Sequence, residues 1–220
     1  PLGAVFAILL PLFLLFVFRQ FDIPNEAYLP ENFTPGIIVF AFSFLTLFES
    51  TLVSRDRTTA LMTRLSVSPM KRAEYVLGYL LSTLPIALLQ CLLITAAGVA
   101  LGLPMRARVL LAIPVALPAA VLFALFGVFI GNIVSDKAAP GVSSVIVQLV
   151  CFTSGMYFPK ELVGNGFAAV CDLLPFGACL DLIRAAVSSD DVFSAADATV
   201  LAGWLAATLA AAALLRKKSI

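Results

Sequence analysis

Residues 76–103 read VLGYLLSTLPIALLQCLLITAAGVALGL, a run of mostly apolar side chains that contains no charged residue. A helix that crosses the roughly 30 Å hydrocarbon core of a bilayer needs about 20 predominantly apolar residues. The run is long enough to make that crossing. It predicts a transmembrane helix and sets the fold class for the whole chain.

Five further stretches have the same apolar character, and Glu49 is the one charged residue within them. We therefore expect an all-α membrane protein with six transmembrane helices, forming one transmembrane domain over residues 1–220. Pro35 and Pro140 lie where a first-turn proline fits a helix. The five stretches are 1–18, 34–53, 109–134, 140–158 and 198–215.

The beginning of the chain allows two interpretations. Residues 1–18 are either the first transmembrane helix or a signal peptide. The helix is favoured because a basic leading region and a small-residue cleavage site, which mark signal peptides, are both missing. Because the sequence opens on Pro1 and not on methionine, we expect the natural chain to begin upstream.

Composition excludes several classes of function. The 220 residues are 61% hydrophobic and 12% charged, and the mean hydropathy is +1.06. A water-soluble domain carries about a quarter charged residues, so this composition excludes one. A formal charge of +1 leaves no basic excess for a nucleic acid. The chain has no histidine, which removes Ser-His and Cys-His nucleophiles and the HExxH zinc motif. We predict no catalytic residue and no metal site, and only Cys171 and Cys179 as a candidate disulfide.

Positive charge alternates between the connections, and Lys and Arg accumulate on the cytoplasmic side of membrane proteins. If the first helix runs outward, nine of the fourteen basic residues lie inside. This predicts a cytoplasmic C-terminus. The nine are Arg55, Arg57, Arg64, Lys71, Arg72, Lys137, Arg216, Lys217 and Lys218.

The longest cytoplasmic connection, residues 54–74, contains an amphipathic segment. Leu61 and Leu65 are four residues apart and share one face of a helix, while Arg57 and Arg64 project from other sides. Such a segment is either a solvated loop that lies on the membrane surface or a docking helix for a cytoplasmic partner.

The motifs along the chain resemble those of ABC-2 type ABC-transporter permeases. Residues 49–78, with Arg-Asp-Arg-Thr-Thr, Arg64-Leu65, Ser68-Pro69 and Gly78, are similar to the second-span end and cytoplasmic loop of that family. Three further stretches follow in the family's order. They are the small-residue span at 123–131, the Ser-Gly…Pro signature at 153–159, and Leu174-Pro-Phe followed by Asp181-Leu-Ile-Arg184.

The resemblance implies a membrane subunit that carries no ATP site. It would work with a second permease copy, identical or similar, and with an ABC ATPase that holds the ATP and magnesium. The sequence agrees, because it lacks the GxxxxGK[ST] phosphate loop. Residues 54–74 would be the coupling helix, with Leu61 and Leu65 in a groove of the ATPase and Arg55, Asp56 and Arg57 orienting the contact. Export of an amphipathic or lipid-like cargo, by alternating access at the permease dimer interface, is the expected activity.

Two regions are candidates for gating or for the substrate path. Glu49 is either a local partner of Arg55 or Arg57, or a substrate or gating contact, since membrane-embedded carboxylates are functional candidates. The other region is the end of the apolar stretch 140–158, with Gly155, Phe158 and the directly following Pro159. The connection that follows, 159–190, is broken by prolines and glycines into short pieces, which predicts an outer re-entrant pair or a plain extracellular loop.

Other features keep alternatives open. Gly127 and Gly131 allow close helix packing, either inside one chain or at a dimer seam. Gln90 and Gln148 are expected to form interhelical hydrogen bonds or to line a cavity. An ATP-independent channel or secondary transporter is disfavoured by the absence of internal repeats and of broken, charged spans. A membrane scaffold is harder to dismiss from sequence.

Overall fold

The computed structural model describes residues 2–21, 28–59, 72–157, 165–188 and 193–215, and this part of the chain is helical without any strand. The predicted all-α class is confirmed. The helices are α1 (Leu2–Gln20), α2 (Pro30–Asp56), α4 (Arg72–Ala100), the 3-10 helix η2 (Ala107–Leu111), α5 (Ala112–Ile133), α6 (Ala139–Thr153), α7 (Asn165–Leu173), α8 (Pro175–Val187) and α9 (Ala195–Leu215).

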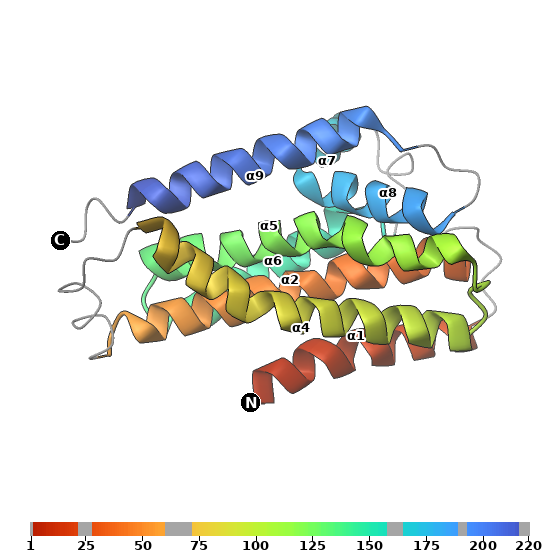
Figure 1. Ribbon diagram of the computed structural model, residues 1–220, viewed down its shortest axis with the longest axis horizontal. Helices are drawn as coiled ribbons and strands as arrows, with labels where there is room; N and C mark the ends of the chain where they lie inside the picture. Colours follow the sequence, from red (N-terminus) through yellow and green to blue (C-terminus); the bar gives the residue numbers. More distant parts are fainter. Residues whose placement is uncertain (1, 22–27, 60–71, 158–164, 189–192, 216–220) are drawn as a thin grey trace.

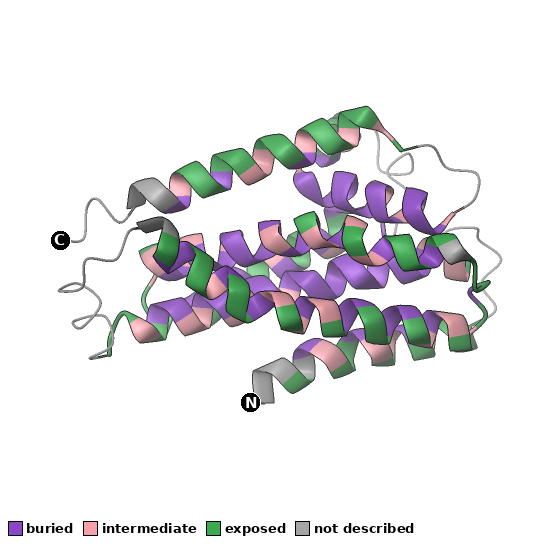
Figure 2. Ribbon diagram, viewed as in Figure 1, coloured by how far each residue is buried: buried purple, intermediate pink, exposed green. Residues whose placement is uncertain are grey.

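Helices α2 and α5 pack along each other in the middle of the bundle (Figure 1). Helices α1, α4, α6 and α8 also contact α2, and α9 packs against α5 and α8. Figure 2 shows α8 almost entirely buried and most of α2 buried, while α4 and α9 carry exposed residues along one side. The exposed side chains include Leu81, Leu89 and Leu92 of α4, which suits a surface that faces lipid.

Four of the described helices are long and apolar enough to cross a membrane, namely α2, α4, α9 and the continuous η2–α5 segment. Helices α7 and α8 form a pair bent by 75°, which would make five spans if the pair crosses once. Helix α6 and the apolar part of α1 are shorter than these. The predicted count of six spans is therefore not established by length and composition.

Local signals explain where two helices differ from their predicted bounds. Helix α2 begins earlier than expected, with Pro30 in its first turn and Glu31 beside the positive end of the helix dipole. Pro35, the predicted first-turn proline, lies inside α2. Helix α6 ends at Thr153, short of residue 158, because the chain turns at Gly155, whose φ of +78° favours glycine.

Gln90 joins three helices. Its Nε2 donates to the carbonyl oxygens of Ala7 in α1, at 2.9 Å, and Ala41 in α2, at 3.4 Å. The predicted interhelical hydrogen bonds are confirmed for this residue. Gln148, by contrast, is exposed on the surface of α6.

Candidate functional site

The end of α2, where the chain enters the connection to α4, holds three residues that the sequence proposes for partner contact. The side chain of Arg55 is exposed. Asp56 accepts a 2.9 Å hydrogen bond from the hydroxyl of Tyr79 in α4. Nη1 of Arg57 donates to the carbonyl oxygens of Gly131, at 2.9 Å, and Val134, at 3.4 Å. We call Asp56, Arg57, Tyr79 and Gly131 the loop-root cluster, because it ties the end of α2 to α4 and α5.

Helix physics explains why Arg57 binds there. The last carbonyl groups of a helix have no partner within the helix, and they carry the negative end of its dipole. The guanidinium of Arg57 supplies both a positive charge and donors to these groups at the end of α5. Leu61 and Leu65, the predicted apolar anchors, lie outside the described residues.

Two glycines of α5 bring α2 unusually close. A Cβ atom added to Gly127 would lie 2.5 Å from Cβ of Glu49 and 2.8 Å from the carbonyl oxygen of Thr46. One added to Gly131 would lie 2.7 Å from Cβ of Val53. These glycines therefore allow close helix packing inside one chain, which is one of the two roles predicted for them.

Polar side chains of α2 reinforce this contact. The hydroxyl of Thr46 donates to the carbonyl oxygen of Phe123 in α5 at 2.8 Å. The hydroxyls of Ser50 and Ser143 lie 2.5 Å apart and join α2 to α6. Since an unsatisfied polar group in a membrane interior costs several kcal/mol, these bonds fix how α2 sits among its neighbours.

Glu49 lies between these contacts and is fully buried. Neither of its carboxyl oxygens has a hydrogen-bond partner in the described part of the chain. The expected local pairing with Arg55 or Arg57 is not formed, because the guanidinium of Arg57 turns to the carbonyl groups at the end of α5. Burying a polar group without a partner is costly, so Glu49 stands out from the packing around it.

The opposite end of the bundle contains a second set of contacts, around Gly155. Arg184 of α8 donates from Nη2 to the carbonyl oxygen of Gly155 at 3.4 Å and from Nε to that of Asn32 at 3.3 Å. It also pairs with Asp181 at 3.5 Å. Arg184 therefore holds the end of α8, the start of α2 and the turn after α6 together. Phe158 and Pro159 lie outside the described residues.

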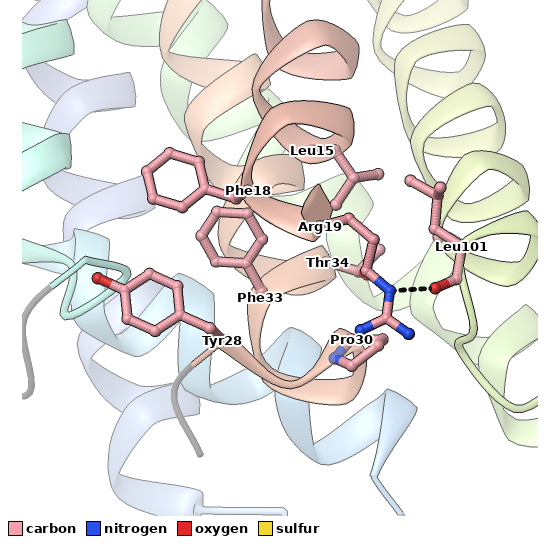
Figure 3. Close-up of a pocket in the computed structure, with 9 residues that line it drawn as sticks. Leu15, Phe18, Arg19, Tyr28, Pro30, Phe33, Thr34 and Leu101 are labelled. Atoms are coloured by element: carbon pink, nitrogen blue, oxygen red, sulfur yellow. Dashed lines mark hydrogen bonds between the residues drawn. The ribbon is translucent and has the colours of Figure 1, made fainter. Parts of the chain in front are cut away.

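A third arginine contact lies at the same end (Figure 3). Nε of Arg19 donates to the carbonyl oxygen of Leu101, at the end of α4, at 2.7 Å. Next to it the rings of Phe18, Tyr28 and Phe33 cluster, and the hydroxyl of Tyr28 donates to the carbonyl oxygen of Tyr157 at 3.1 Å.

Sequence reasoning missed the roles of Arg19 and Arg184. Both are among the five basic residues that the charge alternation leaves on the outer side of the membrane. For Arg19 the available signal, a cation directly after an apolar run, indicates a membrane boundary. It does not indicate which carbonyl group the cation reaches.

Neither a disulfide nor a metal cluster is found among the described residues. Cys171 and Cys179 are buried and are not joined to each other. No group of three or more Cys, Asp or Glu side chains in the described ranges could hold a metal ion.

Comparison with known proteins places the chain in a family. The family described as ABC-2 type transporter matches residues 2–187. No curated protein and no solved structure matches the chain. The matched range includes the loop-root cluster, the glycines of α5 and Arg184. The chain therefore belongs to the ABC-2 type transporter family and is a transmembrane permease of the ABC transporter kind.

Proposed function

We propose that this permease is driven by a separate ABC ATPase that docks on residues 54–74. Leu61 and Leu65 would fill a groove of the ATPase, and ATP and magnesium would be bound there and not by this chain. The observation that carries the proposal is the loop-root cluster. Asp56 and Arg57 lie in the first part of the proposed docking segment, before Leu61 and Leu65, and bind α4 and α5.

The cluster supports a way to transmit movement. A force applied to the docking segment reaches α2 at its end, and α2 is joined there to two other helices. The tight contact of α2 with Gly127 and Gly131 then favours movement of α2 and α5 together, because close-packed helices shift as rigid bodies. No chemical step belongs to this chain.

The same proposal includes a topology. We infer six spans in an inner membrane, with a cytoplasmic C-terminus and with α7–α8 as an outer re-entrant pair. Arg184, near the end of α8, binds Gly155, which precedes the pair. This contact supports a path in which the α7–α8 pair starts at one end of the bundle and returns to the same end. A pair that crossed the membrane once would end on the opposite side.

The cargo we propose is amphipathic or lipid-like, and it moves outward between two permease copies by alternating access. Exposed apolar side chains on α1, α4 and α6, among them Phe13, Leu81 and Phe152, support contact with such molecules and with a second copy. Glu49 and Gly155 remain our candidates for gating or for the substrate path, together with Phe158 and Pro159.

Co-purification of the full-length protein with its candidate ATPase tests the docking proposal. We expect a stable complex for the wild type and its loss for Leu61→Asp, because truncating or charging a buried apolar anchor costs far more than changing a rim residue. Thr63→Asp is the matched control. It adds the same charge two residues away, on another side of a helix, and should keep the complex.

Two results would contradict the proposal. One is an intact complex and normal transport in Leu61→Asp. The other is a wild-type protein that purifies without an ATPase and moves solutes across liposomes by itself, as a channel or secondary transporter would.

A further inference from the structure

A groove opens on the side of the bundle where α4 ends and α5 begins. Its volume is about 590 Å³, within the range of sites that hold small molecules. One wall is the last part of α4, and the other is formed by η2 and the start of α5. Its lining includes Leu92, Thr95, Val99, Met105, Arg106 and Leu110.

The lining is apolar except for Thr95 and Arg106, and it includes no carboxylate. Leu92, Met105 and Leu110 are exposed, so the groove is open to its surroundings. Arg106 lies in the connection that follows α4, where the apolar run of that helix has ended. Its side chain is 47% exposed, and its Nη1 lies 3.7 Å from a carboxylate oxygen of Glu31.

This combination favours a particular occupant. An apolar cavity is a poor site for water, and the groove adjoins the exposed leucines of α4. A molecule that fits must combine a hydrocarbon chain with a negatively charged group at one end. Arginine recognises phosphate through two parallel hydrogen bonds.

We propose that the groove is a binding site for an anionic phospholipid of the surrounding bilayer, with an acyl chain along Leu92, Val99 and Leu110 and the phosphate on Arg106. Moving a chain from bulk lipid into the groove gains little, because lipid is as apolar as the lining. Selectivity therefore comes from charge. One basic residue near the surface favours an anionic headgroup about fivefold.

A tryptophan reporter measures this selectivity directly. The chain has one tryptophan, Trp204, which is replaced by Phe, and Leu110→Trp places the reporter in the groove. The full-length protein is reconstituted in nanodiscs of phosphatidylglycerol and phosphatidylcholine, with bromine on the chains of one lipid at a time. We expect quenching to show about fivefold preference for phosphatidylglycerol. A second reporter, Leu81→Trp, lies on the exposed surface of α4 and should show a ratio near one.

Charge variants separate a built site from general surface attraction. Arg106→Gln should bring the ratio at the groove reporter to about one, and Arg106→Lys should keep most of the preference. Arg108→Gln is the matched control, because it removes a neighbouring exposed cation that does not line the groove. Glu31→Gln should keep or increase the preference, since it removes the carboxylate beside Arg106.

Two outcomes would overturn the proposal. One is equal quenching by the two brominated lipids at the Leu110→Trp reporter in protein that carries no charge substitution. This result does not depend on how any charge variant folds. The other is an equal loss in Arg106→Gln and Arg108→Gln, which means attraction to the whole surface. The ATPase is absent from this experiment, so either outcome leaves the proposed function untouched.

Discussion

The guanidinium of Arg57, one residue beyond α2, donates a 2.9 Å hydrogen bond to the carbonyl oxygen of Gly131, near the end of α5. Two other arginines act in the same way at the opposite end. Arg19 donates to Leu101, and Arg184 donates to Gly155. In each case the cation binds a carbonyl group at or just after the end of another helix, where the dipole is negative. Arg184 also reaches the carbonyl oxygen of Asn32 in the first turn of α2. These three contacts join helices that are distant in sequence.

Removing the Arg57 contact should weaken the bundle. We expect Arg57→Ala to lower the free energy of unfolding by about 1 kcal/mol, below the range for a buried hydrogen bond to a charged group, because Arg57 is exposed. Thermal unfolding in detergent measures the change. Arg55→Ala removes a neighbouring exposed cation and should have little effect. Equal losses in both variants would contradict the specific role of Arg57.

Adding a methyl group at Gly127 should be more damaging. The new Cβ would meet Cβ of Glu49 and the main-chain oxygen of Thr46, and backbone atoms cannot move aside without separating α2 from α5. We expect Gly127→Ala to destabilise the protein by about 1–3 kcal/mol. Gly203→Ala in α9 is the control, because nothing lies within 4 Å of its added Cβ and alanine favours a helix. Comparable stability for both variants would show that the close approach is not required.

The sequence predicted the helical class because apolar runs of membrane length are a direct physical requirement of a bilayer. It also predicted the break before α8, since Pro175 begins that helix. It did not predict that Arg57 would leave Glu49 without a partner. The spacing along the chain allows Arg57 either to pair with Glu49 or to turn away from it. Which of the two forms depends on where α5 ends in space. The groove beside Arg106 was missed for the same reason, because its walls come from α4, η2 and α5.

Glu49 offers a test of whether its carboxyl group has an unseen partner. Glu49→Gln keeps the shape and removes the ionisable group. We expect unchanged or higher stability, by up to about 2 kcal/mol, because an unpartnered buried group that can ionise costs at least as much as an amide. Thermal unfolding of the isolated permease measures it. A clear loss of stability would mean that a cation reaches Glu49, from the undescribed residues or from a second copy.

The hydrogen bond between Tyr79 and Asp56 should affect how movement of the docking segment reaches α4 more than it affects binding of the ATPase. We expect Tyr79→Phe to keep the complex with the ATPase and to reduce transport per ATP hydrolysed several-fold, because α4 is then released from the end of α2. Asp56→Ala combined with Tyr79→Phe should be no worse than Asp56→Ala alone, since each change removes the same bond. Fully additive losses would show that the two residues act separately.

The topology of α7–α8 provides the last test, by labelling introduced cysteines with a membrane-impermeant maleimide. In a background without the native cysteines, Ser188→Cys should react from the same side as Met105→Cys, because Arg184 holds the end of α8 at the start of α2 and at the turn after α6. Lys137→Cys, in the turn between α5 and α6, should react from the other side. If Ser188→Cys shared the side of Lys137→Cys, the pair would cross the membrane and the re-entrant path would be wrong.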